Sequence, residues 1–356
     1  MRVALVYDRL NKIGGAEQVL IAFHELFPQA DWYTSFWDPN TTPFSRQWLV
    51  HTSWLNQIPL LRHKHEWIPY LMPFVFEYFD FSSYDLVISV GSAEVKGIIT
   101  GPTTYHLHYC LTPTRYLYSH KAQYLKTWLH RFVGDILRKW DLVAATRPDE
   151  MIAISTQVKN RIKKYYKRDS EIIFPPVDTK RFAIPVTQCH SDTSYFLTVS
   201  RLVPYKKIDV LIKAANLAKA PLIVIGTGSQ YSKLAKLAGP TVSLLGFVPD
   251  SALVRYYGRA KAFLQANVED FGIAMCEALA SGVPVIAYAV GGAKDIVVPG
   301  TNGVLLADAS VASFAKALKE FDTMSFVASD CIKSVARFDK AKWKQKILRR
   351  VSKLCR

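Results

Sequence analysis

The stretch Glu269-Asp270-Phe271-Gly272-Ile273-Ala274-Met275-Cys276-Glu277 lies between two short apolar segments, residues 262–266 and 283–287. The flanking segments have the length and composition of buried strands, and the apolar residues after the Phe-Gly pair predict a helix. A helix that begins directly after a strand presents free backbone N–H groups and the positive end of its dipole. This segment therefore predicts a binding site for a phosphate group.

Two carboxylates, Glu269 and Glu277, bracket the predicted helix start. Because carboxylates repel phosphate, we expect them to accept hydrogen bonds from hydroxyl groups on either side of it. A ligand with a central anion and hydroxyl-bearing groups at both ends is a nucleotide sugar. The alternative is that both residues lie on a solvated helix face, as most Glu residues do. The apolar character of the helix argues against it, because a Glu in such a helix needs a partner or a function.

The length of 356 residues suits two domains of similar size. Half of the residues are hydrophobic and 21% are charged, which favours a globular over a disordered chain. No segment reaches the ~18 uninterrupted apolar residues of a spanning helix, and the apolar start ends at Asp8, too early for a signal peptide. The five widely spaced cysteines predict reduced thiols in a cytoplasmic protein.

The net charge of +16 is expected to attract polyanions such as nucleic acid, anionic lipid or phosphorylated substrates. Basic residues gather in three segments, 121–140, 159–168 and 338–356. The first and last also carry apolar residues at helical spacing, a pattern that suits a helix lying on an anionic membrane. For each helix alone, an ordinary surface helix that covers a core is the stronger alternative. The three together favour contact with an anionic membrane surface.

Strands and helices alternate along the chain, which predicts parallel sheets covered by helices. We expect an α/β protein with two doubly wound Rossmann-like domains facing a central cleft, where ligands lie beyond the carboxyl ends of the strands. Paired prolines near residues 172–182 mark the boundary. Residues 32–84, rich in aromatics and proline, are interpreted as a surface-lining insertion. The expected domains are 1–182, 190–335 and a basic C-terminal helix at 336–356 that packs back toward the N-terminal domain.

Several loops after predicted strands carry residues suited to phosphate binding. Arg201 and Lys206, five positions apart, can clamp a diphosphate from two sides, although a solvated basic loop is the alternative. Glycines permit close approach of the backbone to a ligand. They occur after five predicted strands, as Gly14-Gly15, Gly226-Thr227-Gly228, Gly246-Phe247-Val248, Phe271-Gly272 and Gly291-Gly292.

Taken together in this order, the motifs from residue 195 to about 308 resemble those of retaining glycosyltransferases of family four, which have the GT-B fold. Gly14-Gly15-Ala16-Glu17 resembles the acceptor-side loop of that family. Residues 112–118 (Thr-Pro-Thr-Arg-Tyr-Leu-Tyr) and 175–178 (Pro-Pro-Val-Asp) are similar to those of bacterial mannosyltransferases of surface polysaccharide assembly.

The resemblance implies a role for each matching residue. Arg201 and Lys206 would neutralise the diphosphate leaving group, and Glu269 would hold the donor sugar with Phe271 and Gly272. Glu277 would bind the ribose hydroxyls, and Phe247 with Val248 would contact the base. No cofactor or divalent metal is implied, because cations and helix dipoles can stabilise the departing charge. The residues implied to bind the donor are Gly14, Gly15, Gly226, Gly228, Phe247, Val248, Asp270, Phe271, Gly272, Ile273 and Glu277.

One position departs from the subgroup, in which a His usually precedes the Thr-Pro pair. This chain has Leu111 there, and the nearby histidines are His106 and His108. Their side chains should point away from that of Leu111 if the segment is a regular strand. His108 is the nearer candidate for a catalytic role. The equal alternative is a polar partner inside the sheet.

We expect a retaining, metal-independent hexosyltransferase that uses a nucleoside-diphosphate sugar, with GDP-mannose favoured. The expected acceptor is a lipid-linked or growing saccharide in bacterial surface polysaccharide biosynthesis, at the cytoplasmic face of the membrane. One alternative is a sugar-nucleotide epimerase of the same fold. Another is a nucleic-acid-binding protein, suggested by the charge, although the sequence holds no recognisable nucleic-acid-binding module.

Overall fold

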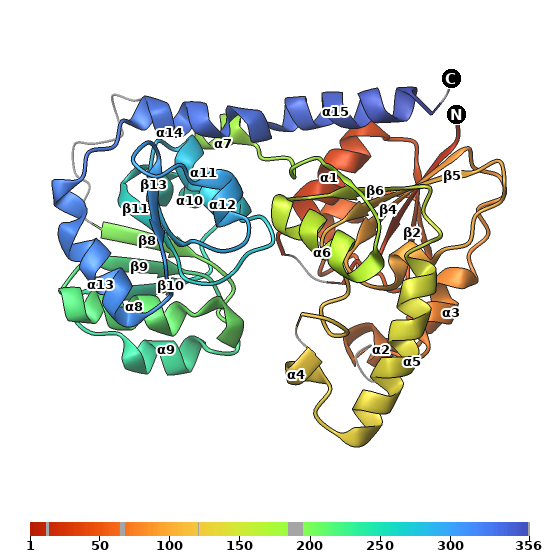
Figure 1. The fold of residues 1–356 in the computed structure, drawn as a ribbon, viewed down its shortest axis with the longest axis horizontal. Coiled ribbons are helices and arrows are strands. Elements are labelled where there is room, and N and C mark those ends of the chain that lie inside the picture. Colours follow the sequence, from red (N-terminus) through yellow and green to blue (C-terminus); the bar gives the residue numbers. More distant parts are fainter. Residues whose placement is uncertain (12–13, 65–67, 120, 184–194, 355–356) are drawn as a thin grey trace. The chain divides into compact units, whose positions relative to one another are not determined.

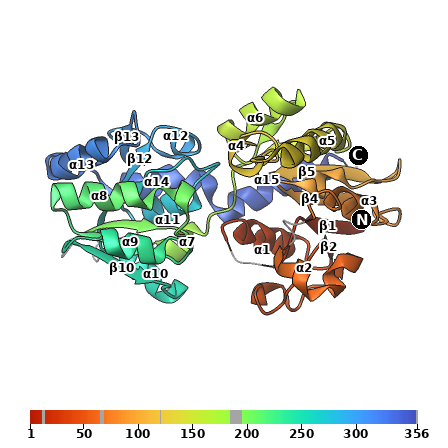
Figure 2. The ribbon, with the colours of Figure 1, turned by 90° about the horizontal axis from the view of Figure 1, so that it is seen from below.

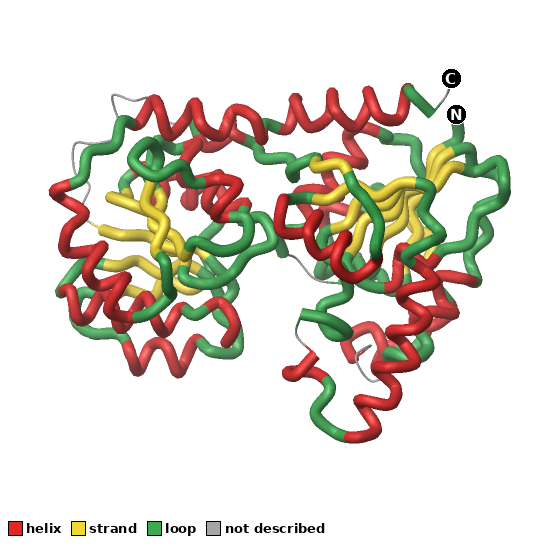
Figure 3. Tube along the Cα trace, in the orientation of Figure 1, coloured by secondary structure: helices red, strands yellow, loops and turns green. Residues whose placement is uncertain are grey.

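The computed structural model describes residues 1–11, 14–64, 68–119, 121–183 and 195–354. The chain divides into an N-terminal unit, Met1–Phe174 with Lys344–Arg356, and a C-terminal unit, Pro175–Trp343. Each unit holds one parallel sheet with helices on both faces (Figures 1 and 3). The two doubly wound α/β units agree with the predicted fold class.

The N-terminal sheet has seven strands in the order β3-β2-β1-β4-β5-β6-β7. The neighbouring strands pair in parallel throughout. Helices lie between the strands along the chain, and Figure 2 shows them from below. The strands are β1 (Val3–Tyr7), β2 (Asp31–Thr34), β3 (Val50–Thr52), β4 (Leu86–Gly91), β5 (Tyr105–Cys110), β6 (Glu150–Ala153) and β7 (Glu171–Ile172), and the helices are α1 (Glu17–Leu26), α2 (Pro59–Lys64), α3 (Met72–Glu77), α4 (Lys121–Tyr124), α5 (Trp128–Ala144), α6 (Thr156–Tyr166) and the shared α15 (Lys340–Ser352).

The C-terminal sheet has six parallel strands in the order β10-β9-β8-β11-β12-β13. Its strands are β8 (Tyr195–Val199), β9 (Leu222–Ile225), β10 (Val242–Gly246), β11 (Ala260–Gln265), β12 (Val285–Tyr288) and β13 (Gly303–Leu306). The helices are α7 (Thr179–Phe182), α8 (Ile208–Ala218), α9 (Tyr231–Leu237), α10 (Asp250–Gly258), α11 (Ile273–Ala280), α12 (Ala293–Ile296), α13 (Val311–Glu320) and α14 (Ala328–Val335).

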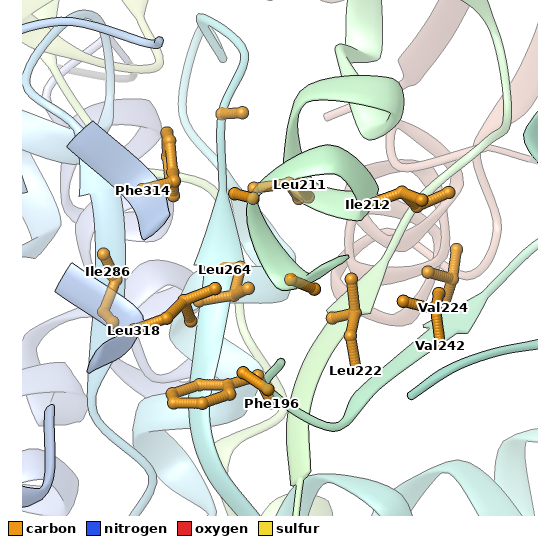
Figure 4. Close-up of a cluster of buried hydrophobic side chains, with 14 of the residues drawn as sticks. Phe196, Leu211, Ile212, Leu222, Val224, Val242, Leu264, Ile286, Phe314 and Leu318 are labelled. Atoms are coloured by element: carbon orange, nitrogen blue, oxygen red, sulfur yellow. The ribbon is translucent and has the colours of Figure 1, made fainter. Parts of the chain in front are cut away.

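The core of the C-terminal unit forms where α8 and α13 cover one face of its sheet. Figure 4 shows side chains from both helices meeting those of the sheet, among them Leu211, Phe314 and Leu264. All three are fully buried. Burial of this apolar surface is the main force that holds the helices on the sheet, and it fixes where the loops after the strands emerge.

Residues 32–84 are not the surface insertion that their composition suggested. They supply β2 and β3 to the sheet, and the side chains of Trp32, Phe36, Phe76 and Phe81 are buried in the N-terminal core. The two strands are short, so alternation of polar and apolar residues is too brief to detect. The aromatic residues belong to the core because large rings bury the most apolar area per residue.

The boundary between the units falls eight residues before the expected end of the first domain at 182. Residues 175–182 belong to the C-terminal unit, where α7 packs on α11 and the ring of Phe182 meets that of Tyr257. The expected start of the second domain, residue 190, lies outside the described residues. At the other end, the part of α15 from Lys344 belongs to the N-terminal unit, with an ion pair from Lys344 to Glu25 at 2.8 Å.

The three basic segments differ in how their apolar faces are covered. Val158 and Ile162 of α6 are buried, and so are Trp343 and Ile347 of α15, so these two helices cover the core in the ordinary way. Helix α5 instead leaves most of its apolar residues exposed. No helix in the described part of the chain is long and apolar enough to cross a membrane.

Candidate functional site

Each sheet reverses its direction of growth at one pair of strands. In the C-terminal unit the pair is β8 and β11, and in the N-terminal unit it is β1 and β4. The loops that follow such a pair diverge to opposite faces of the sheet and leave a crevice beyond the carboxyl ends of the strands. Arg201 and Lys206 lie in the loop after β8, and residues 269–272 lie in the loop after β11.

A cation and an anion meet in this crevice of the C-terminal unit. The Lys206 ammonium group, on the loop after β8, forms an ion pair with the Glu269 carboxylate, on the loop after β11. The side chains are only 13% and 21% exposed, so water screens their attraction less than at an open surface. The sequence prediction placed both residues at one site, and the structure brings them into contact across 63 positions of sequence.

Two further polar residues, which were not among the predicted site residues, organise the Glu269 carboxylate. The Asn267 amide donates a hydrogen bond to Glu269 Oε1 at 3.0 Å, and the Gln265 amide donates to Asn267. Both Gln265 and Asn267 are buried. The sequence did carry a signal for these two residues, because amide side chains at and just after the end of a buried strand need hydrogen-bond partners.

Close backbone packing fixes the loop that carries Lys206. Gly226, after β9, has a φ of +140°, and a Cβ atom on it would lie 1.9 Å from the Ser200 carbonyl oxygen. A side chain at this position would therefore push the loop after β8 out of place. On the other side of the crevice, the Gly292 N–H donates to the Glu269 carbonyl at 2.9 Å, which anchors the loop after β11.

Arg201, the second predicted cation, is exposed, and its guanidinium donates a hydrogen bond to the Tyr205 hydroxyl at 2.8 Å. It shares the loop after β8 with Lys206 but not the contact with Glu269. Arg201 therefore lies in the same loop as Lys206, with its guanidinium group in solvent beside Tyr205.

The turn into α11 is built on Gly272, which has a φ of +111° and directly precedes the first helical residue, Ile273. The backbone conformation at Gly272 is one that residues with a side chain rarely adopt. Phe271 is buried, with its ring 5.2 Å from that of Phe338, and Asp270 is buried beside it. Only the backbone of this Phe-Gly pair is left to contact a ligand.

Glu277 lies one helical turn before the end of α11 and is partly buried. The Tyr257 hydroxyl donates to Glu277 Oε2 at 2.8 Å. Burial raises the pKa of Glu277 to about 7, against the lowering effects of that hydrogen bond and of the Arg181 charge. Arg181 in turn forms an ion pair with Asp250 at 2.9 Å. Glu277 therefore has a defined environment and does not lie on the solvated helix face that the alternative required.

The remaining predicted donor residues follow β9 and β10. Gly228 has a φ of +156°, and a Cβ atom there would lie 2.4 Å from the Leu202 carbonyl oxygen. The Phe247 ring is strongly exposed, and Val248 beside it is partly buried. An exposed aromatic ring at the carboxyl end of a strand provides a flat apolar surface on which a base can stack.

In the N-terminal unit, the loops after β1 and β4 are tied together. The Asp8 carboxylate accepts hydrogen bonds from the backbone N–H groups of Ser92, Ala93 and Val95 at 2.8, 3.2 and 3.1 Å. Arg9 forms an ion pair with Glu94 at 3.0 Å. These contacts fix the carboxyl edge of the N-terminal sheet.

The predicted acceptor-side glycines follow β1. The Gly14 N–H donates to Glu17 Oε2 at 2.6 Å, and Gly15 is exposed with open space around it. Glu17 is buried at the start of α1. The exposed Gly15 backbone remains accessible to a ligand, as the Gly pair predicted, whereas the Gly14 N–H already has a partner.

His108 lies inside the N-terminal unit. It and His106 are buried on β5, and both rings contact the Ser89 hydroxyl on β4, at 2.8 and 2.7 Å. Burial lowers the pKa of His106 to about 3 and that of His108 well below its ordinary value. This geometry favours the alternative of a polar partner inside the sheet, because a buried ring cannot touch a substrate.

Comparisons with known proteins indicate the family that the C-terminal unit resembles and the fold of the chain. Residues 179–338 match the family model described as glycosyl transferases group 1. A GDP-mannose-dependent alpha-mannosyltransferase of Mycolicibacterium smegmatis is 36% identical over 109 residues, which are 30% of this chain and 29% of that protein. A GDP-mannose-dependent monoacylated alpha-(1-6)-phosphatidylinositol monomannoside mannosyltransferase of Corynebacterium glutamicum is 32% identical over 188 residues, 45% of this chain and 49% of that protein. The chain spans about half, or less, of the length of the curated relatives that it matches.

Solved structures match over nearly the whole chain. Anabaena HepE in complex with UDP-glucose has a TM-score of 0.73 at 20% identity, covering 99% of this chain and 100% of that one. The lipopolysaccharide outer core galactosyltransferase WaaB has a TM-score of 0.69 at 18% identity, covering 99% of each chain. At such identities the likeness concerns the fold. Residues 179–338 are therefore similar to the group 1 glycosyltransferases, and the fold of the chain is that of solved GT-B glycosyltransferases.

Proposed function

We propose that the protein is a retaining glycosyltransferase that moves a sugar from a nucleoside-diphosphate donor to a saccharide acceptor. The observation that carries the proposal is the contact between Lys206 and Glu269 at the strand reversal of the C-terminal sheet. This contact supports the proposal, because an ammonium group suited to a diphosphate lies beside a carboxylate suited to sugar hydroxyls. The start of α11 and the Glu277 carboxylate follow in the same segment.

The height of the barrier to sugar transfer depends on how well the protein stabilises the charge of the leaving group. When the bond from the anomeric carbon to the phosphate oxygen breaks, negative charge develops on the diphosphate. Lys206 and Arg201, together with the N–H groups at the start of α11, would stabilise that charge because they are fixed before the reaction. Lys206 holds Glu269 in the present structure, so a bound diphosphate would share the ammonium group with that carboxylate.

The proposed bond formation keeps the configuration of the anomeric carbon. The acceptor hydroxyl oxygen attacks on the face from which the diphosphate departs, and the departing phosphate oxygen takes the hydroxyl proton. A new C–O bond thus replaces the old one, and the products are a glycoside and a nucleoside diphosphate. Glu277 would accept hydrogen bonds from the ribose hydroxyls, and Phe247 would stack on the base. No divalent metal takes part in this proposal.

The names of the relatives guide the choice of substrates. Because two matching mannosyltransferases are described as GDP-mannose-dependent, we propose GDP-mannose as the donor. We propose a lipid-linked or growing saccharide as the acceptor, in bacterial surface polysaccharide biosynthesis at the cytoplasmic face of the membrane.

A two-stage experiment tests the proposal on the full chain. First, the thermal midpoint is measured with GDP, UDP, ADP and their sugars, since a ligand that binds the native state alone raises it. Then the best donor is incubated with lipid-linked saccharides, with and without EDTA, and the anomeric configuration of the product is read by NMR.

The expected result is a metal-independent α-linked product from an α-linked donor. The Glu277→Ala variant should lose transfer while it remains folded, and the remote Glu320→Gln variant should keep it. Full transfer by Glu277→Ala would contradict the assignment. Conversion of the donor sugar without any acceptor would instead identify an epimerase.

A further inference from the structure

Helix α5 exposes a face that a helix of a globular protein normally buries. Only Gly134, Leu137, Asp141 and Ala144 of its 17 residues are buried. On the open side Trp128 is 79% exposed, and Phe132 and Ile136 follow it at intervals of four residues, so the three lie on one face. Exposing apolar side chains to water is unfavourable, whereas exposing polar ones is not. A stripe of exposed apolar residues therefore indicates a binding surface.

Helix α3, which is linked to α5 through Glu77, also carries exposed aromatic residues. Glu77 of α3 accepts a hydrogen bond from the Trp140 indole at 2.8 Å and forms an ion pair with Arg147 at 2.7 Å, which holds α3 beside α5 (Figure 1). Phe74 and Tyr78 lie three positions before and one position after Glu77, and both are strongly exposed. We give the name α5–α3 face to the exposed apolar residues of these two helices, which are Phe74, Tyr78, Trp128, Leu129, Phe132, Ile136 and Val143.

Cations accompany the α5 part of the α5–α3 face. Lys126, Arg131 and Lys139 are exposed along α5 and the segment before it. Within the helix, Asp135 is the exposed acidic residue, and it is already paired with Lys121 at 3.4 Å. The other acid of α5, Asp141, is buried against Lys96. The rim therefore carries net positive charge around aromatic and aliphatic side chains.

We propose that the α5–α3 face binds an anionic lipid bilayer, with the aromatic side chains entering the interface and the cations contacting lipid phosphates. Trp and Tyr suit this depth because one part of each ring system is apolar and the other polar. Amphipathic helices with basic residues beside an apolar stripe bind membranes in this way. Helices α6 and α15 have the same composition, but their apolar faces are buried, so they do not share this role.

Vesicle sedimentation of the full chain tests this proposal, which does not rest on the donor site. The wild-type protein should pellet with phosphatidylcholine vesicles that contain phosphatidylglycerol and much less with phosphatidylcholine alone. Trp128→Ser/Phe132→Ser should weaken binding by at least about tenfold, and Lys126→Glu/Lys139→Glu by at least about tenfold, since each cation near an anionic surface contributes about fivefold. Leu217→Ser and Lys236→Glu, exposed positions on α8 and α9, serve as controls and should bind as the wild type does.

The outcomes separate this surface from the donor site and from other occupants. Because Trp128 and Phe132 are exposed, their variant should keep the circular dichroism spectrum and the nucleotide-induced thermal shift, whereas Glu277→Ala should lose the shift and still pellet. Equal pelleting with neutral vesicles, or unchanged pelleting of the Trp128/Phe132 variant, would overturn the proposal. The proposal would also be overturned if light scattering showed that the wild type is a dimer, that this variant is a monomer, and that the wild type binds no vesicles. The α5–α3 face would then join two copies of the chain.

Discussion

Replacing Glu269 by Gln should separate diphosphate binding from sugar transfer. In the wild type, the Glu269 carboxylate forms an ion pair with Lys206 and partly neutralises its charge. A phosphate that contacts the same ammonium group would also be repelled by this nearby carboxylate. Glutamine keeps the size and the hydrogen-bonding capacity with Asn267 but removes the negative charge. We expect the variant to bind a nucleoside diphosphate more tightly and to transfer sugar more slowly.

The size of the effect follows from the geometry. A phosphate that shares Lys206 with Glu269 would have its charge about 6 Å from that of the carboxylate, because both groups contact one ammonium nitrogen at hydrogen-bond distance. At an effective dielectric constant of about 20, two unit charges at this separation interact by about 3 kcal/mol. This corresponds to about a hundredfold in the dissociation constant. The transfer rate should fall by about a hundredfold or more, because the donor sugar loses a preorganised charged partner.

Isothermal titration with the nucleoside diphosphate measures the first quantity, at pH 8 so that the terminal phosphate keeps one ionisation state. The transfer assay measures the second. Glu320→Gln is the matched control, because Glu320 pairs with a lysine on α13, outside the crevice. If Glu269→Gln binds the diphosphate no more tightly than the wild type, Lys206 does not serve the phosphate, and the reasoning fails.

Two further predictions concern buried charge. Since the pKa of Glu277 is raised to about 7 from its ordinary value near 4.5, affinity for a nucleoside-diphosphate sugar should rise between pH 6 and 8 as the carboxyl group loses its proton, and Glu277→Gln should remove this rise. Because the pKa of Glu277 is higher in the folded state, the bound proton contributes to the free energy of unfolding. This contribution is fully present below about pH 4.5 and is lost as the pH rises through 7. In urea unfolding, Glu277→Gln should not show that loss of stability. Separately, Lys96→Met should reduce the free energy of unfolding by about 3–5 kcal/mol, because the ion pair of Lys96 with Asp141 is almost fully buried. The double variant Lys96→Met/Asp141→Asn should recover part of this loss, and a single variant as stable as the wild type would refute the account.

Local patterns along the sequence predicted much of the fold. The predicted strands at residues 262–266 and 283–287 overlap β11 and β12, and the helix predicted after the Phe-Gly pair is α11, because each element carries its own apolar pattern and its own ending signals. Strands β2 and β3 were missed, since three or four residues are too few to show a period. The motif from Glu269 to Glu277 was assigned to a loop and helix start from its residues alone, and the structure places it there.

Tertiary structure decided which predicted residues meet and which faces remain open. The sequence shows that Lys206 and Glu269 suit one ligand, but the order of strands in the sheet brings them together. It shows two histidines near a motif, but only the pairing of β4 with β5 buries them around Ser89. Three segments share a basic composition, yet only α5 keeps its apolar face in solvent. A sequence pattern records which side of an element is apolar, whereas the packing of distant elements determines what, if anything, covers it.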